Sequence, residues 1–146
     1  MAVLVDYRKA KFEYETLETY EAGIELLGFE VKSLRAKHAS LDGAYIVIKG
    51  GEAYLQNMLI SPYQEKNTPK DYEPRRHRRL ILSKKEINQL SHIEKGLTIV
   101  PISAYTKANL IKISVAVVRG KKKYDKRESI KKRETDREMG RVMRDR

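Results

Sequence analysis

Cysteine is absent from this sequence of 146 residues. Without it there can be neither a disulfide framework nor a thiolate zinc site, which suits a reducing compartment. Long apolar runs are missing too. The richest, Leu110 to Val118, contains Lys112 and falls far short of the roughly 20 apolar residues of a membrane helix. The apolar stretch Ala2 to Val5 is too short for the core of a signal peptide, so we expect a cytoplasmic protein.

Negative charge is also in short supply. The 20 Asp and Glu residues are outnumbered by 31 Lys and Arg residues, which gives a formal net charge of +11. Residues 121–146 have twelve Lys and Arg against six Asp and Glu, a net +6, while residues 1–120 have 19 against 14, a net +5. Such a basic chain favours a polyanionic partner.

The length allows one compact domain, residues 1–120, and a basic tail, residues 121–146. Aliphatic and thioether side chains in the tail are limited to Ile130, Met139, Val142 and Met143. These are too few to offset the entropy of ordering it, so we expect a tail that is disordered when free. Drawn as a helix, the tail carries a basic stripe without an apolar face. That suits an RNA groove, although a solubilising tail would have the same composition.

Strand patterns dominate residues 1–120. Residues 12–27 indicate one long bent strand or two, with Gly23 and Gly28 as bends or ends. Residues 44–48 and 53–60 flank the hairpin signal Lys49-Gly50-Gly51-Glu52. Residues 97–105 and 110–119 flank a second turn at 106–109, and the odd-numbered positions 111 to 117 share one apolar face.

Two short helices are predicted among the strands. Ser83 and Glu86 form a capping box ahead of the apolar stripe Ile87, Leu90 and Ile93, and Gly96 would end that helix. A second helix, residues 29–36, would point Val31 and Leu34 inward and Lys32 and Arg35 outward. Five or six antiparallel strands with two or three small helices favour a mainly β fold, an OB-like barrel.

The densest basic cluster is Arg75-Arg76-His77-Arg78-Arg79, close to Tyr72. Its guanidiniums can bind phosphate and stack on bases, whereas a solvated loop with incidental charge is the alternative. We expect the domain to contact RNA through basic residues of this cluster, of the 29–36 helix and of the N-terminal basic patch: Arg76, Arg78, Arg79, Lys32, Arg35 and Lys11.

Motifs of enzymes are absent from the sequence. It has no nucleophile elbow, P-loop, dinucleotide fingerprint or HExxH motif, and His38, His77 and His92 lack metal-ligand spacing. Glu30-Val31-Lys32, with Glu21 as a second carboxylate, resembles the pattern of some metal-dependent nucleases. A small nuclease therefore stays open as an alternative, but we expect a protein without catalytic residues, metal or cofactor.

Five collinear segments between Arg8 and Arg133 resemble the family of the SsrA-binding protein, also called small protein B. They are Tyr20-Glu21-Ala22-Gly23-Ile24, Glu30 to Ala36, Ile60-Ser61-Pro62-Tyr63, Pro74-x-Arg76-x-Arg78 with the apolar residues that follow, and Gly120-Lys121-Lys122-x-Tyr124-Asp125-Lys126-Arg127. The resemblance implies an OB-like barrel with small helices and a basic tail.

The resemblance also implies a function. Members of this family bind the transfer-RNA-like part of transfer-messenger RNA and deliver it to ribosomes stalled on messages without a stop codon. That step permits trans-translation, in which the unfinished peptide is tagged and the ribosome released. We therefore expect a non-enzymatic adaptor with two partners, transfer-messenger RNA and the ribosome, and a monomer in the complex. An ordinary ribosomal protein is a further alternative.

Family positions that contact RNA correspond to Glu21 and Ile81. The tail is implied to become helical in the empty message path and decoding centre, with Gly120 as a hinge and Tyr124 stacking on a ribosomal base. The expected ribosome contacts are Gly120, Lys121, Lys122, Tyr124, Asp125, Lys126, Arg127, Ile130, Lys131 and Arg133.

Departures from the family pattern occur at Tyr7, at Lys37-His38 and at Tyr124, where some relatives have His. Tyr7 stands where Asn is usual, so an Asn-type hydrogen bond to RNA would be lost or moved. Lys37-His38 stands where Gly-Lys is usual, which keeps a positive charge but changes the expected local turn.

Overall fold

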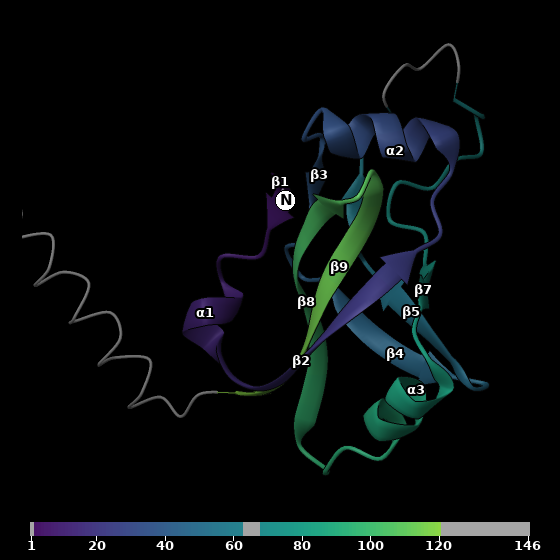
Figure 1. The fold of residues 1–146 in the computed structure, drawn as a ribbon. Coiled ribbons are helices and arrows are strands. Elements are labelled where there is room, and N and C mark those ends of the chain that lie inside the picture. The colour runs from purple at the N-terminus through teal and green to yellow at the C-terminus, as the bar shows by residue number, and fades with distance from the viewer. Residues whose placement is uncertain (1, 63–67, 121–146) are drawn as a thin grey trace, which may run out of the picture.

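The computed structural model describes residues 2–62 and 68–120, and Figure 1 shows their fold. The residues predicted to contact the ribosome, from Lys121 to Arg133, lie outside the described residues, as does the side chain of Lys11. Strands are the dominant element of the described part, and the predicted mainly β fold is confirmed. No helix in this part is long and apolar enough to cross a membrane.

Seven strands form one antiparallel sheet. In pairing order they are β1 (Ala2–Asp6), β8 (Leu97–Lys107), β9 (Leu110–Gly120), β2 (Tyr14–Ile24), β7 (Arg78–Ile81), β5 (Glu52–Gln56) and β4 (Tyr45–Lys49). Four strands separate β4 from β8 in this order, yet the two pack against each other, so the sheet curls into a barrel-like shape. A separate two-stranded ribbon consists of β3 (Ala39–Ser40) and β6 (Leu59–Ile60).

Three short helices accompany the strands: α1 (Ala10–Glu13), α2 (Gly28–Arg35) and α3 (Lys84–Ser91). Figure 1 shows α2 and α3 at opposite ends of the sheet. The capping box of α3 is confirmed, since Ser83 Oγ accepts from the Glu86 amide at 3.1 Å and the Glu86 carboxylate accepts from the Ser83 amide at 3.1 Å. These two bonds satisfy amides that the first helical turn cannot pair.

The core fills the inside of the curled sheet. Ile113, Val115 and Val117 of β9 are buried in the main cluster, and the partly buried Ile111 packs against it, so the predicted apolar face is confirmed. On α2, Leu34 is buried, Val31 is half-buried, and Lys32 and Arg35 are exposed, as predicted. The side chains that remain outward are therefore set by strand alternation and by one helix face.

Both predicted hairpins are present. Gly50 and Gly51 link β4 to β5 with φ of 60° and 75°, a left-handed pair that suits the twist of a two-residue turn. The second turn is tighter than predicted. The strands β8 and β9 extend to Lys107 and from Leu110, which leaves only Ala108 and Asn109, also at positive φ.

Three element boundaries differ from the sequence-based prediction. Residues 10–13 are helical, so the long strand begins at Tyr14 instead of residue 12. The predicted strand 53–60 is divided into β5 and β6, because Asn57 between them has a left-handed φ of 65°. The helix α3 ends at Ser91, several residues before Gly96.

Candidate nucleic-acid interface

Four side chains from α2, the loop that precedes β7 and β7 itself form a largely buried polar cluster, which we call the Glu30 clamp: Glu30, Tyr72, Arg76 and Arg78. The Glu30 carboxylate is fully buried and accepts hydrogen bonds from the Tyr72 hydroxyl at 2.8 Å and the Arg78 Nε at 2.8 Å. It also pairs with the Arg76 guanidinium and accepts from the Leu27 amide at the start of α2. The clamp thereby ties three segments of the chain together.

Arg78 was predicted to contact RNA, but the structure places its side chain inside the protein. Its side chain is wholly buried because it is the inward residue at the start of β7. Beyond Glu30, its guanidinium donates to the carbonyl oxygens of Met58 at 2.7 Å and Pro74 at 3.0 Å. No surface of the group is left for a phosphate. Arg76 keeps 30% of its side chain exposed, but it too is engaged by Glu30.

The same geometry argues against the nuclease alternative. Burial alone would raise the pKa of Glu30, but hydrogen bonds from Arg76 and Leu27 and the charge of Arg78 outweigh it and lower that pKa. The carboxylate is thus ionised, fully paired and inaccessible to a metal. Among residues 2–62 and 68–120, no three acidic or histidine side chains are grouped so as to hold a metal ion.

Arg79, the next residue, faces outward. It pairs with Glu25 at 2.6 Å and Glu52 at 2.9 Å, and its side chain is 40% exposed. Successive residues of a strand point to opposite faces, so the two arginines serve different surfaces. Arg79 is placed where RNA can reach it, and its carboxylate partners hold its position.

A groove lies beside Arg79 on the outward face, and we call it the Ile81 groove. Ile81 and Leu110 are its exposed apolar side chains, at 53% and 59%, and Arg35 and Lys112 are its cations. Its volume is about 270 Å³, and it is lined by Gly23, Ile24, Leu26, Val31, Arg35, Ile81, Asn109, Leu110, Ile111 and Lys112. Apolar contact area edged by positive charge suits the sugar and phosphate of RNA.

Strand register explains how distant residues meet in this groove. Tyr105 lies opposite Lys112, Lys112 opposite Gly23, and Gly23 opposite Ile81, so four strands contribute to one outward row. A Cβ on Gly23 would stand 3.2 Å from the Ile81 Cβ. Glycine therefore allows Ile81 to lie directly over β2.

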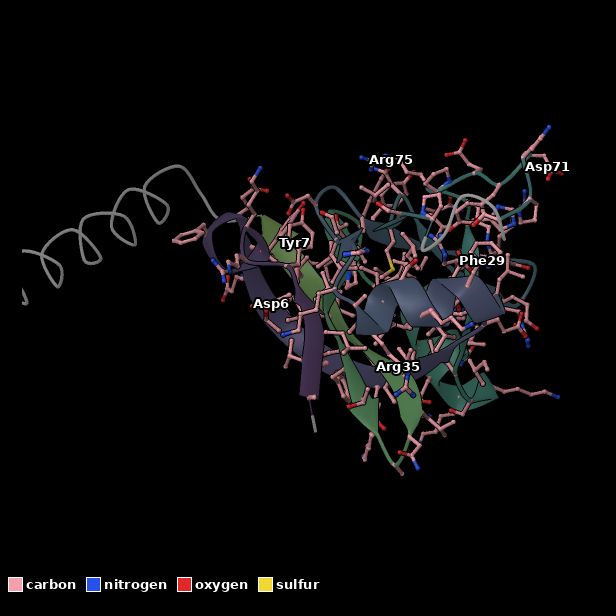
Figure 2. The ribbon with its side chains drawn as sticks, turned by 90° about the horizontal axis from the view of Figure 1, so that it is seen from above. Asp6, Tyr7, Phe29, Arg35, Asp71 and Arg75 are labelled. Carbon is pink, nitrogen blue, oxygen red and sulfur yellow. The ribbon has the colours of Figure 1, made fainter. Side chains whose placement is uncertain are left out.

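Helix α2 closes one side of the groove. The Arg35 guanidinium donates to the Asn109 carbonyl oxygen at 3.4 Å and so joins α2 to the turn between β8 and β9. Figure 2 shows Arg35 on the side of α2 that faces this turn, and Arg75 beyond the opposite side of the helix. Arg75, the first residue of the basic cluster, therefore lies away from this groove (Figure 2).

Glu21 adjoins the groove on the same outward face. Its carboxylate accepts from the Tyr105 hydroxyl at 2.6 Å and from Lys107 Nζ at 3.3 Å, and its side chain is 39% exposed. The hydrogen bond from Tyr105, with further help from Lys107 and Lys112, lowers the pKa of Glu21. An oriented and accessible carboxylate of this kind can accept from a base amino group or a ribose hydroxyl. We call Glu21, Tyr105 and Lys107 the Glu21 cluster.

The structure brings together Glu21, Arg35 and Ile81 of the predicted RNA contacts, with Arg79 beside them. Lys32 is exposed on α2. Tyr7 is only 5% exposed and packs in the core, so its side chain does not offer a substitute for a surface Asn.

Sequence reasoning missed Tyr105, Lys107, Leu110 and Lys112. Lys112 had a visible signal, since it interrupts an apolar strand and must point away from the core if Ile111 and Ile113 point inward. The others depend on the tight turn and on strand pairing, which local sequence does not specify.

The fold and this surface together define a class: a small antiparallel β-barrel protein with an apolar and cationic face of the kind that contacts structured RNA. Residues 4–145 match a protein-family model described as "SmpB protein". The chain belongs to the SmpB family, as the resemblance predicted.

Similar proteins span nearly the whole chain. An SsrA-binding protein of Elusimicrobium minutum is 55% identical over 134 residues, 90% of this chain and 85% of the relative. One from Gloeothece citriformis is 49% identical over 143 residues, 97% of this chain and 92% of the relative. A solved structure described as "tmRNA-SmpB: a journey to the center of the bacterial ribosome" has a TM-score of 0.68 and 40% identity, covering 89% of this chain and 95% of that one. Family membership confirms a binding protein rather than an enzyme.

Proposed function

We propose that this protein binds transfer-messenger RNA and acts with it on the ribosome in trans-translation. The observation that carries the proposal is the outward row in which Lys112, Gly23 and Ile81 lie side by side, next to Glu21. Membership of the SmpB family supports the choice of RNA, because the relatives are SsrA-binding proteins.

Each group in the surface has a distinct task in this proposal. Ile81 and Leu110 pack against ribose and base surfaces of the transfer-RNA-like part, and Arg35 and Lys112 neutralise phosphates. Glu21 accepts from an exposed base amino group or 2′-hydroxyl, held in place by Tyr105. Lys32 adds positive charge at the margin, and Arg79 can bind a phosphate there by exchanging a carboxylate partner for it. Arg78 and, in large part, Arg76 hold the fold instead of the RNA.

The second part of the proposal concerns the tail. Gly120 is the last residue of β9, where it lies opposite Tyr14 at the edge of the described fold. We propose that residues 1–120 hold the RNA and that residues 121–146 enter the empty message path and become helical there. The protein would act as a monomer in the cytoplasm, where ribosomes are.

Equilibrium binding tests the first part. Fluorescence anisotropy with a labelled transfer-messenger RNA transcript should show tighter binding than with an unrelated folded RNA of equal length. Arg35→Ala should weaken binding and lower the log–log salt slope by roughly 0.7 to 0.9, because one phosphate contact is lost. Ile81→Ala should weaken binding with the slope unchanged. Leu17→Ala is the matched control, since Leu17 is an exposed apolar residue away from the groove. Equal affinity for both RNAs would refute the proposal.

Truncation after Gly120 tests the second part. The shortened protein should keep its affinity for transfer-messenger RNA but lose peptide tagging in a reconstituted translation system with stalled ribosomes. Tagging by the truncated protein would show that the division of labour is wrong. Sedimentation of ribosomes on a sucrose gradient adds a further check, because an ordinary ribosomal protein would accompany all ribosomes equally.

A further inference from the structure

The outward face of the sheet continues past the Ile81 groove. His77 precedes β7 with an exposed side chain, and Arg79 and Ile81 follow it on the same face. Tyr54 of β5 lies opposite Arg79, and Val47 of β4 lies opposite Tyr54. The face therefore runs from the groove, across Arg79, onto β5 and β4.

A second cavity occupies this extension. It has a volume of about 400 Å³ and is lined by Val47, Lys49, Gly50, Tyr54, Gln56 and His77. The rings of Tyr54 and His77 form a T-shaped pair, with centroids 5.6 Å apart and an interplanar angle of 86°. Because the pair holds both rings before a ligand arrives, binding there costs little side-chain entropy. The volume is in the range of small-ligand sites.

The lining has the chemistry of a nucleotide site. Aromatic rings stack on any base, and the Gln56 amide offers both a donor and an acceptor to a base edge. Lys49 is an exposed cation at the hairpin tip, within reach of a phosphate. The carboxylates of Glu25 and Glu52 are both paired with Arg79, and neither of them lines the cavity.

We propose that this Tyr54–His77 cavity binds an unpaired nucleotide of transfer-messenger RNA by base stacking. The proposal rests on the proposed function, because it extends the same RNA surface beyond the Ile81 groove. Arg79 connects the two places, because it lies between Ile81 and His77 along this edge of the sheet. Its guanidinium can contact a phosphate that spans them only if that phosphate displaces Glu25 or Glu52 from it. The site would prefer an unstacked base, because a paired base in a helix cannot present its face to the rings.

Photo-cross-linking and affinity together test the site. Transfer-messenger RNA transcribed with 4-thiouridine is irradiated on the full-length protein, and the linked peptides are identified by mass spectrometry. We expect links at Tyr54 or His77. In anisotropy with the same RNA, Tyr54→Ala should weaken binding by about 5- to 100-fold, as expected for the loss of one stacked base. Tyr54→Phe, which keeps the ring, should bind nearly as well as the parent protein.

A salt titration separates stacking from charge. Neither Tyr54→Ala nor His77→Ala removes a permanent cation, so the log–log salt slope should stay as in the parent, whereas Arg35→Ala lowers it. Gln89→Ala, in the separate groove between β2 and α3, is the off-site control. Thermal melts establish that each variant folds. If Tyr54→Ala does not fold, the exposed His77 decides the question through His77→Ala.

The outcomes distinguish this inference from the proposed function. Unchanged affinity in Tyr54→Ala and His77→Ala, with weakening by Ile81→Ala, would overturn the stacking site and leave the proposed function standing. Links from the labelled transfer-messenger RNA that fall only on residues outside this cavity would also overturn it. If the parent protein shows no preference for transfer-messenger RNA, both proposals fail together.

Discussion

Glu30 and Glu21 have the same kinds of partner and opposite surroundings. Each carboxylate accepts from a tyrosine hydroxyl and from cationic side chains, Tyr72 with Arg76 and Arg78 in one case and Tyr105 with Lys107 in the other. The Glu30 carboxylate is fully buried, whereas the Glu21 side chain is 39% exposed. Burial, together with the bond to its glutamate, raises the pKa of each tyrosine to about 12.

This comparison shows how burial divides the work between the two clusters. A buried ion pair has lost its hydration, so removal of one partner leaves an uncompensated charge in a medium of low dielectric. An exposed pair exchanges its partners for water at little cost and can exchange them equally well for RNA. The Glu30 clamp is therefore suited to holding the fold and the Glu21 cluster to binding.

The largest contrast is expected between Glu30→Gln and Glu21→Gln. Glu30→Gln leaves the buried Arg78 without its counter-charge and should lower the free energy of unfolding by about 3–5 kcal/mol. Glu21→Gln should leave stability nearly unchanged and weaken the binding of transfer-messenger RNA. Urea denaturation and anisotropy measure the two effects. Equal stability of the two variants would show that Glu30 does not hold the fold more than Glu21 does.

Two adjacent arginines give a second test of the contrast between buried and exposed ion pairs. Arg78→Lys should cost about 2–3 kcal/mol, because an ammonium group cannot replace a guanidinium that bonds Glu30 and three carbonyl oxygens at once. Its affinity for transfer-messenger RNA should match that of the parent. Arg79→Lys should have little effect on stability, since the group is exposed. Unchanged stability of Arg78→Lys together with weaker RNA binding would return Arg78 to the RNA surface.

Tyr72 and Tyr105, the partners of the two glutamates, allow the same test with smaller expected effects on stability. Tyr72→Phe removes a donor from Glu30 and from the Ile60 carbonyl oxygen, and should cost about 1–3 kcal/mol. Tyr105→Phe removes only an exposed hydrogen bond to Glu21 and should cost much less. It should nevertheless weaken RNA binding, because Glu21 loses its orienting partner. Chemical denaturation of both variants, with anisotropy for the second, checks these expectations.

Lowering the pH should remove the stability that the Glu30 clamp contributes. The pKa of Glu30 is lowered from 4.5 in the folded state, so the unfolded chain binds more protons as the pH falls. The stability that Glu30 contributes is complete above about pH 4.5 and is lost as the pH falls through its lowered pKa. Urea denaturation from pH 7 to pH 3 should show a shallower decline in Glu30→Gln than in the parent protein. Parallel declines would mean that other carboxylates control acid unfolding.

The comparison also shows which features could be predicted from the sequence and which could not. Local signals were sufficient for the capping box at Ser83, the Gly50-Gly51 hairpin and the outward face of α2. Both Arg78 and Arg79 were assigned to the RNA surface from the sequence. Local sequence could not show that Arg78 is buried, because the partner Glu30 is 48 residues distant in the chain. The groove depends on the register of four strands, and no local pattern encodes that register.

Lys37, which departs from the family pattern, gives the smallest expected effect. It follows α2, the helix that carries Glu30 inward and Arg35 outward, and has a left-handed φ of 63°. The Lys37 amide donates to the Leu34 carbonyl oxygen and the His38 amide to that of Ser33, the bonding pattern of a helix end that usually contains glycine.

A side chain in the left-handed region costs about 1 kcal/mol, so Lys37→Gly should stabilise the protein by about that amount and raise its melting temperature by roughly 3 °C. Ala36→Gly is the matched control, since Ala36 has a φ of −82° and gains nothing from glycine. RNA affinity should change little in either variant, because stabilising the helix end leaves Arg35 and the groove as they are. If Ala36→Gly raised the melting temperature as much as Lys37→Gly, the left-handed conformation at Lys37 would not be the cause of the stabilisation.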